Sequence, residues 1–328
     1  MRIAKCLLLL CCGFGGGADA QHLLVVNQAD SSLGIIDPLS GKQVATLAEG
    51  IPGMHAHEVA SSPDGRTAYL PIYGNVGVGK PGRDGREMLV VDLPSGRITG
   101  RVDFGHGVRP HLPVPGPRNS MLYVTTELDK TVTEIDPKTL KIVGTIPTGQ
   151  EQSHMLVLSH DGRRGYTANV GPGTVSVLDM VHRKTLAIIP VSGNVQRIAI
   201  SNDNRLVFTS DQTKPQLAVI DAATNKVKAW IPMPGTGYGA AATADGRWLL
   251  VALRTVHAVA VIDLHTLRVA KTIEVGADPE EMLIPKGKDT AYVSCSGSDE
   301  VDAIDLKTWT LAQRITAGKF PDGMAWAQ

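Results

Sequence analysis

The sequence predicts an all-β fold, a seven-bladed β-propeller built from four-stranded antiparallel blades. The first observation is a set of seven aspartates, each of which closes a run rich in Val and Ile. The last six are 44, 43, 42, 42 and 42 residues apart, and the first gap is 55. A fixed period of this length in segments of alternating hydrophobicity is typical of one blade per repeat. The seven are Asp37, Asp92, Asp136, Asp179, Asp221, Asp263 and Asp305.

The strands of a single repeat can be placed from its turn signals. In the fourth repeat, Asp161-Gly162 between two apolar runs predicts a tight hairpin, because Gly tolerates the positive φ that such turns demand. The aspartate that closes the third strand is expected to turn the chain through side-chain hydrogen bonds to the nearby backbone, which is a structural role. The expected strands are 155–159, 165–169, 174–179 and 184–190.

A constant register is the second observation. One aromatic or apolar residue of the second strand, called the marker here, lies thirteen residues before the closing aspartate in six repeats. In the remaining repeat Tyr69 lies twenty-three residues before Asp92, so an insertion of ten residues is expected within 74–86. The six regular markers are Leu24, Tyr123, Tyr166, Phe208, Leu250 and Tyr292.

The two ends of the chain are complementary, which is the third observation. The N-terminal part begins with a second strand at 23–27, whereas the C-terminal part stops after a first strand at 323–327. The last strand is therefore expected to complete the first blade and close the ring without an exposed edge.

Residues 1–20 are interpreted as a secretory signal peptide. They combine a basic start, an apolar core at 7–12 and a small-residue cleavage motif at 18–20. A lipoprotein is less favoured because Leu10, before the paired cysteines, is not small. We therefore expect a periplasmic or secreted protein in which residues 21–328 form a single propeller.

Composition excludes several classes of protein. The 32 basic and 32 acidic residues balance, which does not favour nucleic acid as a partner. The later hydrophobic segments are short and alternating, so no transmembrane segment is expected. Beyond the leader, Cys295 is the one cysteine, and a buried structural thiol is its default interpretation. A covalent c-type haem is excluded because no Cys-x-x-Cys-His occurs, whereas a non-covalent haem or a quinone stays open.

The inserted segment 74–86 contains a near match to a phosphate-binding loop. The match at 74–80 fails because Pro81 follows it and no helix pattern begins there, whereas the motif works at a helix N-terminus. Two alternatives remain, a flap over the channel mouth, with Arg83 and Arg86 reaching an anion, or an idle surface loop.

Several segments resemble a known family. Tyr123-Val124-Thr125, then the runs 132–137 and 141–149, resemble the YVTN-repeat β-propellers. The resemblance covers residues 21–328 and implies the fold, but it implies little about activity. Members resemble surface-layer repeat proteins and, more distantly, the propellers of methylamine dehydrogenase, cytochrome cd1-type reductases and sugar lactonases. Function in such propellers therefore depends on the residues of a site and not on the fold.

A ring of polar residues is expected at one mouth of the central channel. The position twelve residues before the marker begins the first strand, which lines the channel. Charged or ionisable residues flank it at His55, Arg109 and Arg197. Around the ring this position reads His57, His111, His154, Gln196, Tyr238, Glu280 and, by matching Met324 to Met282, Asp322.

Three interpretations of this ring compete. It can be a polar, water-lined mouth. It can be a metal site in which His57, His111 and His154 bind Zn, Cu, Fe or Mn and a carboxylate from Asp322 or Glu280 completes the coordination. It can also be a metal-free site in which a histidine acts as a base and arginine grips an anion. The ligand-binding residues would then be Arg109, Arg197, Gln196, Tyr238 and His55.

The leading functional hypothesis is an exported propeller that binds a metal ion or a small anionic ligand at this mouth. One alternative is a metal-dependent or histidine-dependent enzyme of the lactonase or lyase type, so catalysis stays open. Another is a protein-interaction scaffold with a protein partner. The content of only 4% aromatic residues disfavours the scaffold.

Overall fold

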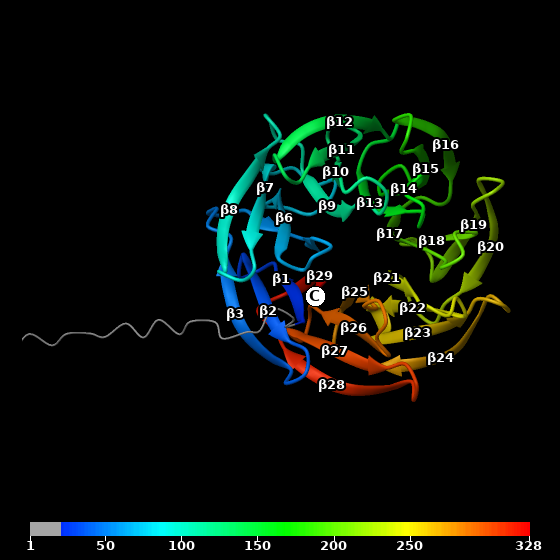
Figure 1. The fold of residues 1–328 in the computed structure, drawn as a ribbon. Coiled ribbons are helices and arrows are strands. Elements are labelled where there is room, and N and C mark those ends of the chain that lie inside the picture. The colour runs from blue at the N-terminus through cyan, green and yellow to red at the C-terminus, as the bar shows by residue number, and fades with distance from the viewer. Residues whose placement is uncertain (1–20) are drawn as a thin grey trace, which may run out of the picture.

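The computed structural model describes residues 21–328, which form seven sheets arranged in a ring (Figure 1). The predicted all-β, seven-bladed propeller is confirmed, with four strands in antiparallel order in each blade. The second blade has one extra short strand, β5, which pairs with β6. The proposed signal peptide, residues 1–20, lies outside the described residues.

The first three blades span the N-terminal part of the chain and the last strand. The first contains β29 (Pro321–Ala327), β1 (His22–Asn27), β2 (Ser32–Asp37) and β3 (Lys42–Ala48). The second contains β4 (His55–Ala56), β5 (Ala60–Ser61), β6 (Thr67–Gly74), β7 (Asp84–Asp92) and β8 (Arg97–Asp103). The third contains β9 (Pro110–Pro115), β10 (Leu122–Thr126), β11 (Thr131–Asp136) and β12 (Lys141–Pro147).

The remaining four blades follow the chain. The fourth contains β13 (Ser153–Leu158), β14 (Arg164–Asn169), β15 (Thr174–Asp179) and β16 (Lys184–Pro190). The fifth contains β17 (Val195–Ile200), β18 (Leu206–Asp211), β19 (Gln216–Asp221) and β20 (Lys226–Pro232). The sixth contains β21 (Gly237–Ala242), β22 (Trp248–Leu253), the 3-10 turn η1 (Arg254–Val256), β23 (Ala258–Asp263) and β24 (Arg268–Glu274). The seventh contains β25 (Pro279–Leu283), β26 (Thr290–Cys295), β27 (Glu300–Asp305) and β28 (Thr310–Thr316).

The closing aspartates act as turn residues, as predicted. Asp37 accepts a hydrogen bond from the Leu39 backbone N–H at 3.0 Å and one from the Ser40 hydroxyl at 2.6 Å. These bonds, the Ser40 hydroxyl first, lower the pKa of Asp37. Asp136 makes the same pair of bonds, to Lys138 and Thr139. The repeated aspartate thus marks the turn that connects the third strand of a blade to the fourth.

The hydrophobic core lies between neighbouring blades. The middle strands are buried on both faces, so they read as continuous apolar runs, whereas the outermost strands alternate between half-buried and exposed residues. One apolar cluster joins strands of the first and second blades, and another joins those of the fifth and sixth. Cys295 is buried in such a cluster, as predicted, and burial raises the pKa of its thiol.

Ring closure occurs as the chain ends predict. β29 pairs antiparallel with β1, with Trp326 opposite Leu23 and Met324 opposite Val25. The C-terminus therefore lies within the first blade, beside β1 (Figure 1). No helix among residues 21–328 has both the length and the apolar character to span a bilayer.

Each first strand carries an irregularity where it reaches the predicted ring. The pairing of first and second strands shifts register across residues 154, 196–197, 238–239 and 280–281. Similar shifts occur in the first and third blades, and in the second blade the first strand is split into β4 and β5. A bulge re-aims side chains and ends ladder pairing. The seven residues of the predicted ring therefore lie where the first strand of each blade departs from regular pairing with the second strand.

Candidate functional site at the channel mouth

The three ring histidines lie together at one mouth of the channel. His57 belongs to the second blade, His111 to the third and His154 to the fourth. The centroids of the His57 and His111 rings are 5.4 Å apart, and those of His111 and His154 are 3.5 Å apart. His55 stacks on His57 at 5.0 Å. We call His57, His111 and His154 the histidine cluster.

The imidazoles of His57 and His111 are buried and neutral. His57 is 8% exposed and His111 is 1% exposed. Burial, reinforced by neighbouring histidines and by Arg197, holds the pKa of both rings well below the ordinary value for histidine. Within residues 21–328, His57 Nε2 and His111 Nδ1 have no hydrogen-bond partner. Buried polar atoms rarely go without a partner, so these two require an explanation.

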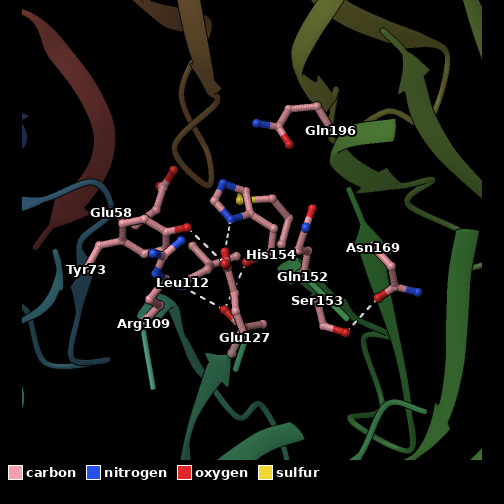
Figure 2. Close-up of polar contacts among 12 residues, drawn as sticks. Glu58, Tyr73, Arg109, Leu112, Glu127, Gln152, Ser153, His154, Asn169 and Gln196 are labelled. Carbon is pink, nitrogen blue, oxygen red and sulfur yellow. Dashed lines mark hydrogen bonds and ion pairs between the residues drawn. The ribbon is translucent and has the colours of Figure 1, made fainter. Parts of the chain in front are cut away.

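The third histidine has a partner that fixes its orientation. His154 Nδ1 makes a short hydrogen bond with Glu127 Oε1, and Glu127 is only 1% exposed. The other oxygen of Glu127 accepts a hydrogen bond from the Tyr73 hydroxyl at 2.8 Å. Figure 2 shows the His154 ring and the Tyr73 ring both directed at the Glu127 carboxylate. The carboxylate holds the His154 ring through Nδ1, so Nε2 is the ring nitrogen that remains available to bind a ligand.

Tyr73 is the wall against which the histidine cluster packs. Its ring centroid lies 4.5 Å from that of His57, 5.3 Å from that of His111 and 5.9 Å from that of His154. Its side chain is fully buried, and burial together with Glu127 raises the pKa of its hydroxyl. Tyr73 therefore stays protonated and donates to Glu127.

Beside the histidine cluster, Arg197 bridges four blades. Its guanidinium pairs with Glu58 of the second blade, Glu281 of the seventh and Asp322 of the first, the last at 2.7 Å. The Arg197 side chain is 5% exposed. Ion pairs at this depth contribute little net stability, but removing one partner leaves an uncompensated buried charge. We call these four residues the arginine cluster.

The carboxylates outnumber the cation in the arginine cluster. Burial raises the pKa of Glu58, Glu281 and Asp322, and the charge of Arg197 opposes that rise. Because one guanidinium faces three carboxyl groups, protonation of a carboxyl relieves the excess negative charge. Burial and the excess negative charge therefore favour the protonated form of a carboxyl group in this cluster.

The first strands approach one another closely around the arginine cluster. A Cβ at Gly323 would lie 2.5 Å from the His57 carbonyl oxygen and 2.5 Å from Glu58 Oε2. Gly239 is crowded in the same way by the backbone at Glu280 and Met282. Glycine is required at both positions because no side chain fits between the strands.

The far side of the mouth has a different chemistry. Gln196 donates to the Tyr238 hydroxyl at 2.9 Å, and the Arg254 and Arg197 guanidinium carbons lie 4.8 and 5.1 Å from the Tyr238 ring centroid. Arg254 also pairs with Glu280 at 3.0 Å. Ser296 donates a second hydrogen bond to that carboxyl at 3.0 Å, and burial raises the pKa of Glu280 to about 7.

The inserted segment 74–86, called the strap, is fastened to the mouth by Arg109. The Arg109 side chain is 7% exposed; its Nε donates to Asp84 Oδ1 at 2.6 Å, and a terminal nitrogen donates to the Lys80 carbonyl oxygen at 2.7 Å. The same guanidinium lies 5.7 Å from the Tyr73 ring centroid. Arg109 thus joins the strap to the wall of the histidine cluster.

The structure distributes the predicted site residues among several partners. His57, His111, His154 and His55 come together, whereas Asp322 turns to Arg197 and Glu280 to Arg254. Within the part of the chain described, no group of three or more His, Cys, Asp or Glu residues is arranged around a common metal position. Arg109 and Arg197, predicted to grip an anion, are both engaged by protein groups.

Sequence reasoning missed Tyr73, Glu127, Arg254 and Ser296. All four lie four residues after the second-strand markers, where the second strand ends. The same position reads Gln28 in the first blade, and Gln28 donates to Asp322. The residues four after each marker form a second ring beside the first ring at the same mouth. The sequence register could therefore have predicted these positions.

The comparisons place the fold among known propellers. Residues 117–241, less than half of the chain, match the Cytochrome D1 heme domain family. The chain is similar to dihydro-heme d1 dehydrogenase NirN in complex with DHE, with a TM-score of 0.64 and 19% identity over 92% of this chain and 65% of that chain. It is also similar to Kuenenia stuttgartiensis hydrazine synthase, with a TM-score of 0.70 and 18% identity over 84% of this chain and 90% of that chain.

These similarities establish the fold and no more. The chain spans less than two thirds of the NirN chain. No curated protein matches the sequence. The findings support a seven-bladed propeller but not the YVTN-repeat family specifically. Fold and site together describe a propeller with a closed, histidine-lined mouth.

Proposed function

We propose that this protein is a ligand-binding propeller that holds a transition-metal ion on the histidine cluster. The observation that carries the proposal is the pair of buried ring nitrogens, His57 Nε2 and His111 Nδ1, that lack a partner among residues 21–328. A neutral imidazole with a free lone pair is the form that ligates Zn, Cu or Fe. An ion between these rings would satisfy both nitrogens.

His154 offers a third imidazole. Because the three rings are not arranged around a common metal position among residues 21–328, coordination by all three would require the rings to turn toward the ion. A metal-binding histidine commonly gives its other ring N–H to a carboxylate, which fixes the tautomer and raises the basicity of the ligating nitrogen. Glu127 supplies that contact to His154 Nδ1. A bound ion would supply redox or Lewis-acid chemistry, and the protein's part is to hold the three rings and exclude water.

The geometry favours a metal over a small anion. An anion site needs a guanidinium or another donor with bonds to spare. Arg197 is shared by three carboxylates, and Arg109 is used by Asp84 and the Lys80 carbonyl. The imidazoles of His57 and His111 are uncharged because burial lowers the pKa of both rings.

The relatives suggest a haem, and the residues present test that suggestion. The imidazoles suit iron, which agrees with the haem named for the matching family and for NirN. A planar macrocycle also needs an open face over its ligand. Here the His111 and His154 rings pack 3.5 Å apart and both unpartnered nitrogens are shielded from solvent. The closed mouth fits an ion and does not fit the macrocycle.

A second candidate function uses the same residues without a metal. The pairing of Glu127 with His154 is the arrangement that orients a histidine as a general base. A lactonase-type or lyase-type reaction would then depend on His154 and be insensitive to chelators. Export through residues 1–20 stays a prediction from the sequence, which N-terminal sequencing of the mature protein checks.

Metal analysis of the purified protein separates these functions. We expect roughly one equivalent of metal per chain after loading with Fe, Cu, Zn or Mn in turn and removal of the excess. The double variant His57→Ala/His111→Ala should lose it, while His182→Ala, whose side chain is 71% exposed, should retain it. Equal metal contents in the double variant and the wild type would refute the proposed site.

A further inference from the structure

Among residues 21–328 the strap is the one large departure from the repeat, and it contacts Arg109 and Gln152, each two residues before a histidine of the histidine cluster. It connects β6 and β7 of the second blade, and in Figure 1 the light-blue segment after β6 reaches toward the middle of the ring. Tyr73, the wall of the histidine cluster, immediately precedes it. The insertion is therefore joined in sequence to a residue that packs against all three rings of the histidine cluster.

Contacts to three blades hold the strap in place. On the second blade, Arg83 donates to the Pro52 carbonyl oxygen at 3.4 Å. On the third, Arg109 binds Asp84 and the Lys80 carbonyl, and the Arg109 backbone N–H donates to the Gly85 carbonyl at 3.0 Å. These are the blades that carry His57 and His111.

The tip of the strap reaches the fourth blade. A Cβ built at Gly79 would lie 3.1 Å from Gln152 Nε2, so the backbone there touches the Gln152 side chain. Gln152 precedes His154 by two residues, as Arg109 precedes His111. The strap therefore runs across the three blades of the histidine cluster in order.

The fastening is strong at one point and weak elsewhere. The buried Arg109 side chain donates one hydrogen bond to the Asp84 carboxylate and one to the Lys80 carbonyl oxygen. The hydrogen bond of Arg83 to Pro52 is long and exposed. Gly74, at the base of the strap, has φ of 152° and packs against the Arg83 carbonyl.

Residues 84–86 stay in β7, where Gly85 accepts from the Val108 and Arg109 backbone N–H groups and Arg86 pairs with Asp103. Residues 75–83, which follow a glycine and are held firmly by the Arg109 side chain alone, can lift as a unit.

We infer that the strap is a lid over the histidine cluster and that the Arg109–Asp84 pair is its latch. The inference rests on the proposed function for the identity of the ligand, but the lid itself is tested without any ligand. While the latch is closed, the site retains a bare metal ion and excludes a planar macrocycle. Opening of the latch sets the rate at which an ion enters or leaves.

Chemical modification of histidine by diethyl pyrocarbonate, followed by mass spectrometry for each residue, tests the lid directly. His106 and His182, with side chains 63% and 71% exposed, serve as internal standards in every sample. In Asp84→Ala, modification of His57 and His111 should accelerate about three- to tenfold relative to those standards, as loss of one charge-assisted hydrogen bond implies. Alanine preserves the Cβ of Asp84, which packs beside Gly107.

Two further variants make the result decisive. Asp103→Ala is the matched control, because it breaks the exposed Arg86–Asp103 pair between β7 and β8 without touching the latch. The second replaces residues 75–83 by Asn-Gly, which closes the Gly74–Asp84 pair of β6 and β7 as a two-residue hairpin. It should expose the histidine cluster more than Asp84→Ala does. Equal modification rates in the wild type, Asp84→Ala and the shortened variant would overturn the lid.

Binding of cobalt(II) then separates the lid from the proposed function. If both are correct, Asp84→Ala speeds association and dissociation of Co²⁺ by similar factors and changes the affinity little. If the histidines become more reactive but no variant binds Co²⁺, the lid stands and the metal function fails. If Co²⁺ binds with equal rates in the wild type and the shortened variant, the lid fails and the metal function stands.

Discussion

Glu127 illustrates how one buried side chain sets the chemistry of its neighbours. Its two oxygens hold His154 and Tyr73, residues from the fourth and second blades, while Glu127 itself belongs to the third. A carboxylate in this position accepts from both, and in a neutral imidazole a proton held on Nδ1 places the lone pair on Nε2. The donor properties of the histidine cluster therefore depend on a residue outside it.

Glu127→Gln tests this dependence. The amide oxygen can still accept from Tyr73, but its NH₂ group donates to His154 Nδ1 and so moves the ring proton to Nε2. We expect metal affinity to fall by about 10- to 100-fold with the fold intact. Competition with a coloured chelator measures the affinity, and nitrogen NMR of the imidazoles reports the tautomer.

Tyr73→Phe is the comparison for that prediction. It removes the 2.8 Å bond to Glu127 and leaves the pairing of Glu127 with His154 in place. Its effect on metal affinity should be several times smaller than that of Glu127→Gln. An equal loss in both variants would mean that the tautomer of His154 does not matter.

At the scale of elements, the short strand β4 depends on a carboxyl group from the preceding connection. Glu49 accepts the Ala56 backbone N–H at 3.1 Å, is fully buried and leaves its second oxygen without a partner among residues 21–328. Burial raises the pKa of Glu49 to about 7. Above that pH a charged group is enclosed next to the strand that leads to His57.

The sign of the resulting pH dependence follows from linkage. The pKa of Glu49 rises from an unfolded value of 4.5 to about 7, so folding takes up a proton between these values. This contribution to stability is complete below pH 4.5 and is lost as the pH rises toward about 7. Glu49→Gln should therefore stabilise the protein at pH 8.5 by about 3 kcal/mol relative to its effect at pH 4.5. Thermal unfolding at the two pH values measures the difference, and a gain independent of pH would contradict it.

The elements also show why part of the site could be predicted and part could not. The ring of His57, His111 and His154 follows from a constant offset to the second-strand marker, because every blade repeats one backbone path. The ion pairs of Arg197 could not be predicted in this way, since its partners Glu58, Glu281 and Asp322 come from other blades around the channel. The period of the repeat does not determine which side chains of different blades meet in the channel.

The strap could be predicted from the sequence only in part. Its length and place follow from the register, because Tyr69 stands ten residues too far from Asp92. The Arg109–Asp84 latch does not, because it depends on the path that nine residues take across the third blade. Arg109 was assigned to a ligand from its position two residues before the ring residue His111, and the structure pairs it with the strap instead.

At the scale of the whole molecule, one strand closes the ring and completes the mouth. β29 pairs with β1, contributes Met324 and Trp326 to the packing against the seventh blade and carries Asp322 to Arg197. Without it, β1 would present an unpaired edge to solvent. Stability and the arginine cluster are therefore coupled through the same strand.

Removal of residues 318–328 tests this closure. We expect the unfolding midpoint to fall by roughly 10 °C or more, or cooperative unfolding to disappear, because a buried strand and a buried ion pair are lost together. The control is a circular permutant that links residue 328 to residue 21 and opens the chain at 233–236, between β20 and β21. It retains every strand and should unfold near the wild-type midpoint, as measured by calorimetry. A truncated protein as stable as the permutant would refute the closure.

X-ray diffraction from metal-loaded crystals, collected on either side of the absorption edge of the metal, locates a bound ion directly. We expect one anomalous peak at the histidine cluster, about 2.0–2.1 Å from His57 Nε2 and His111 Nδ1 for zinc. A well-measured data set from the loaded protein with no peak near these nitrogens, or with a peak only at exposed histidines such as His182, would contradict the proposed metal site.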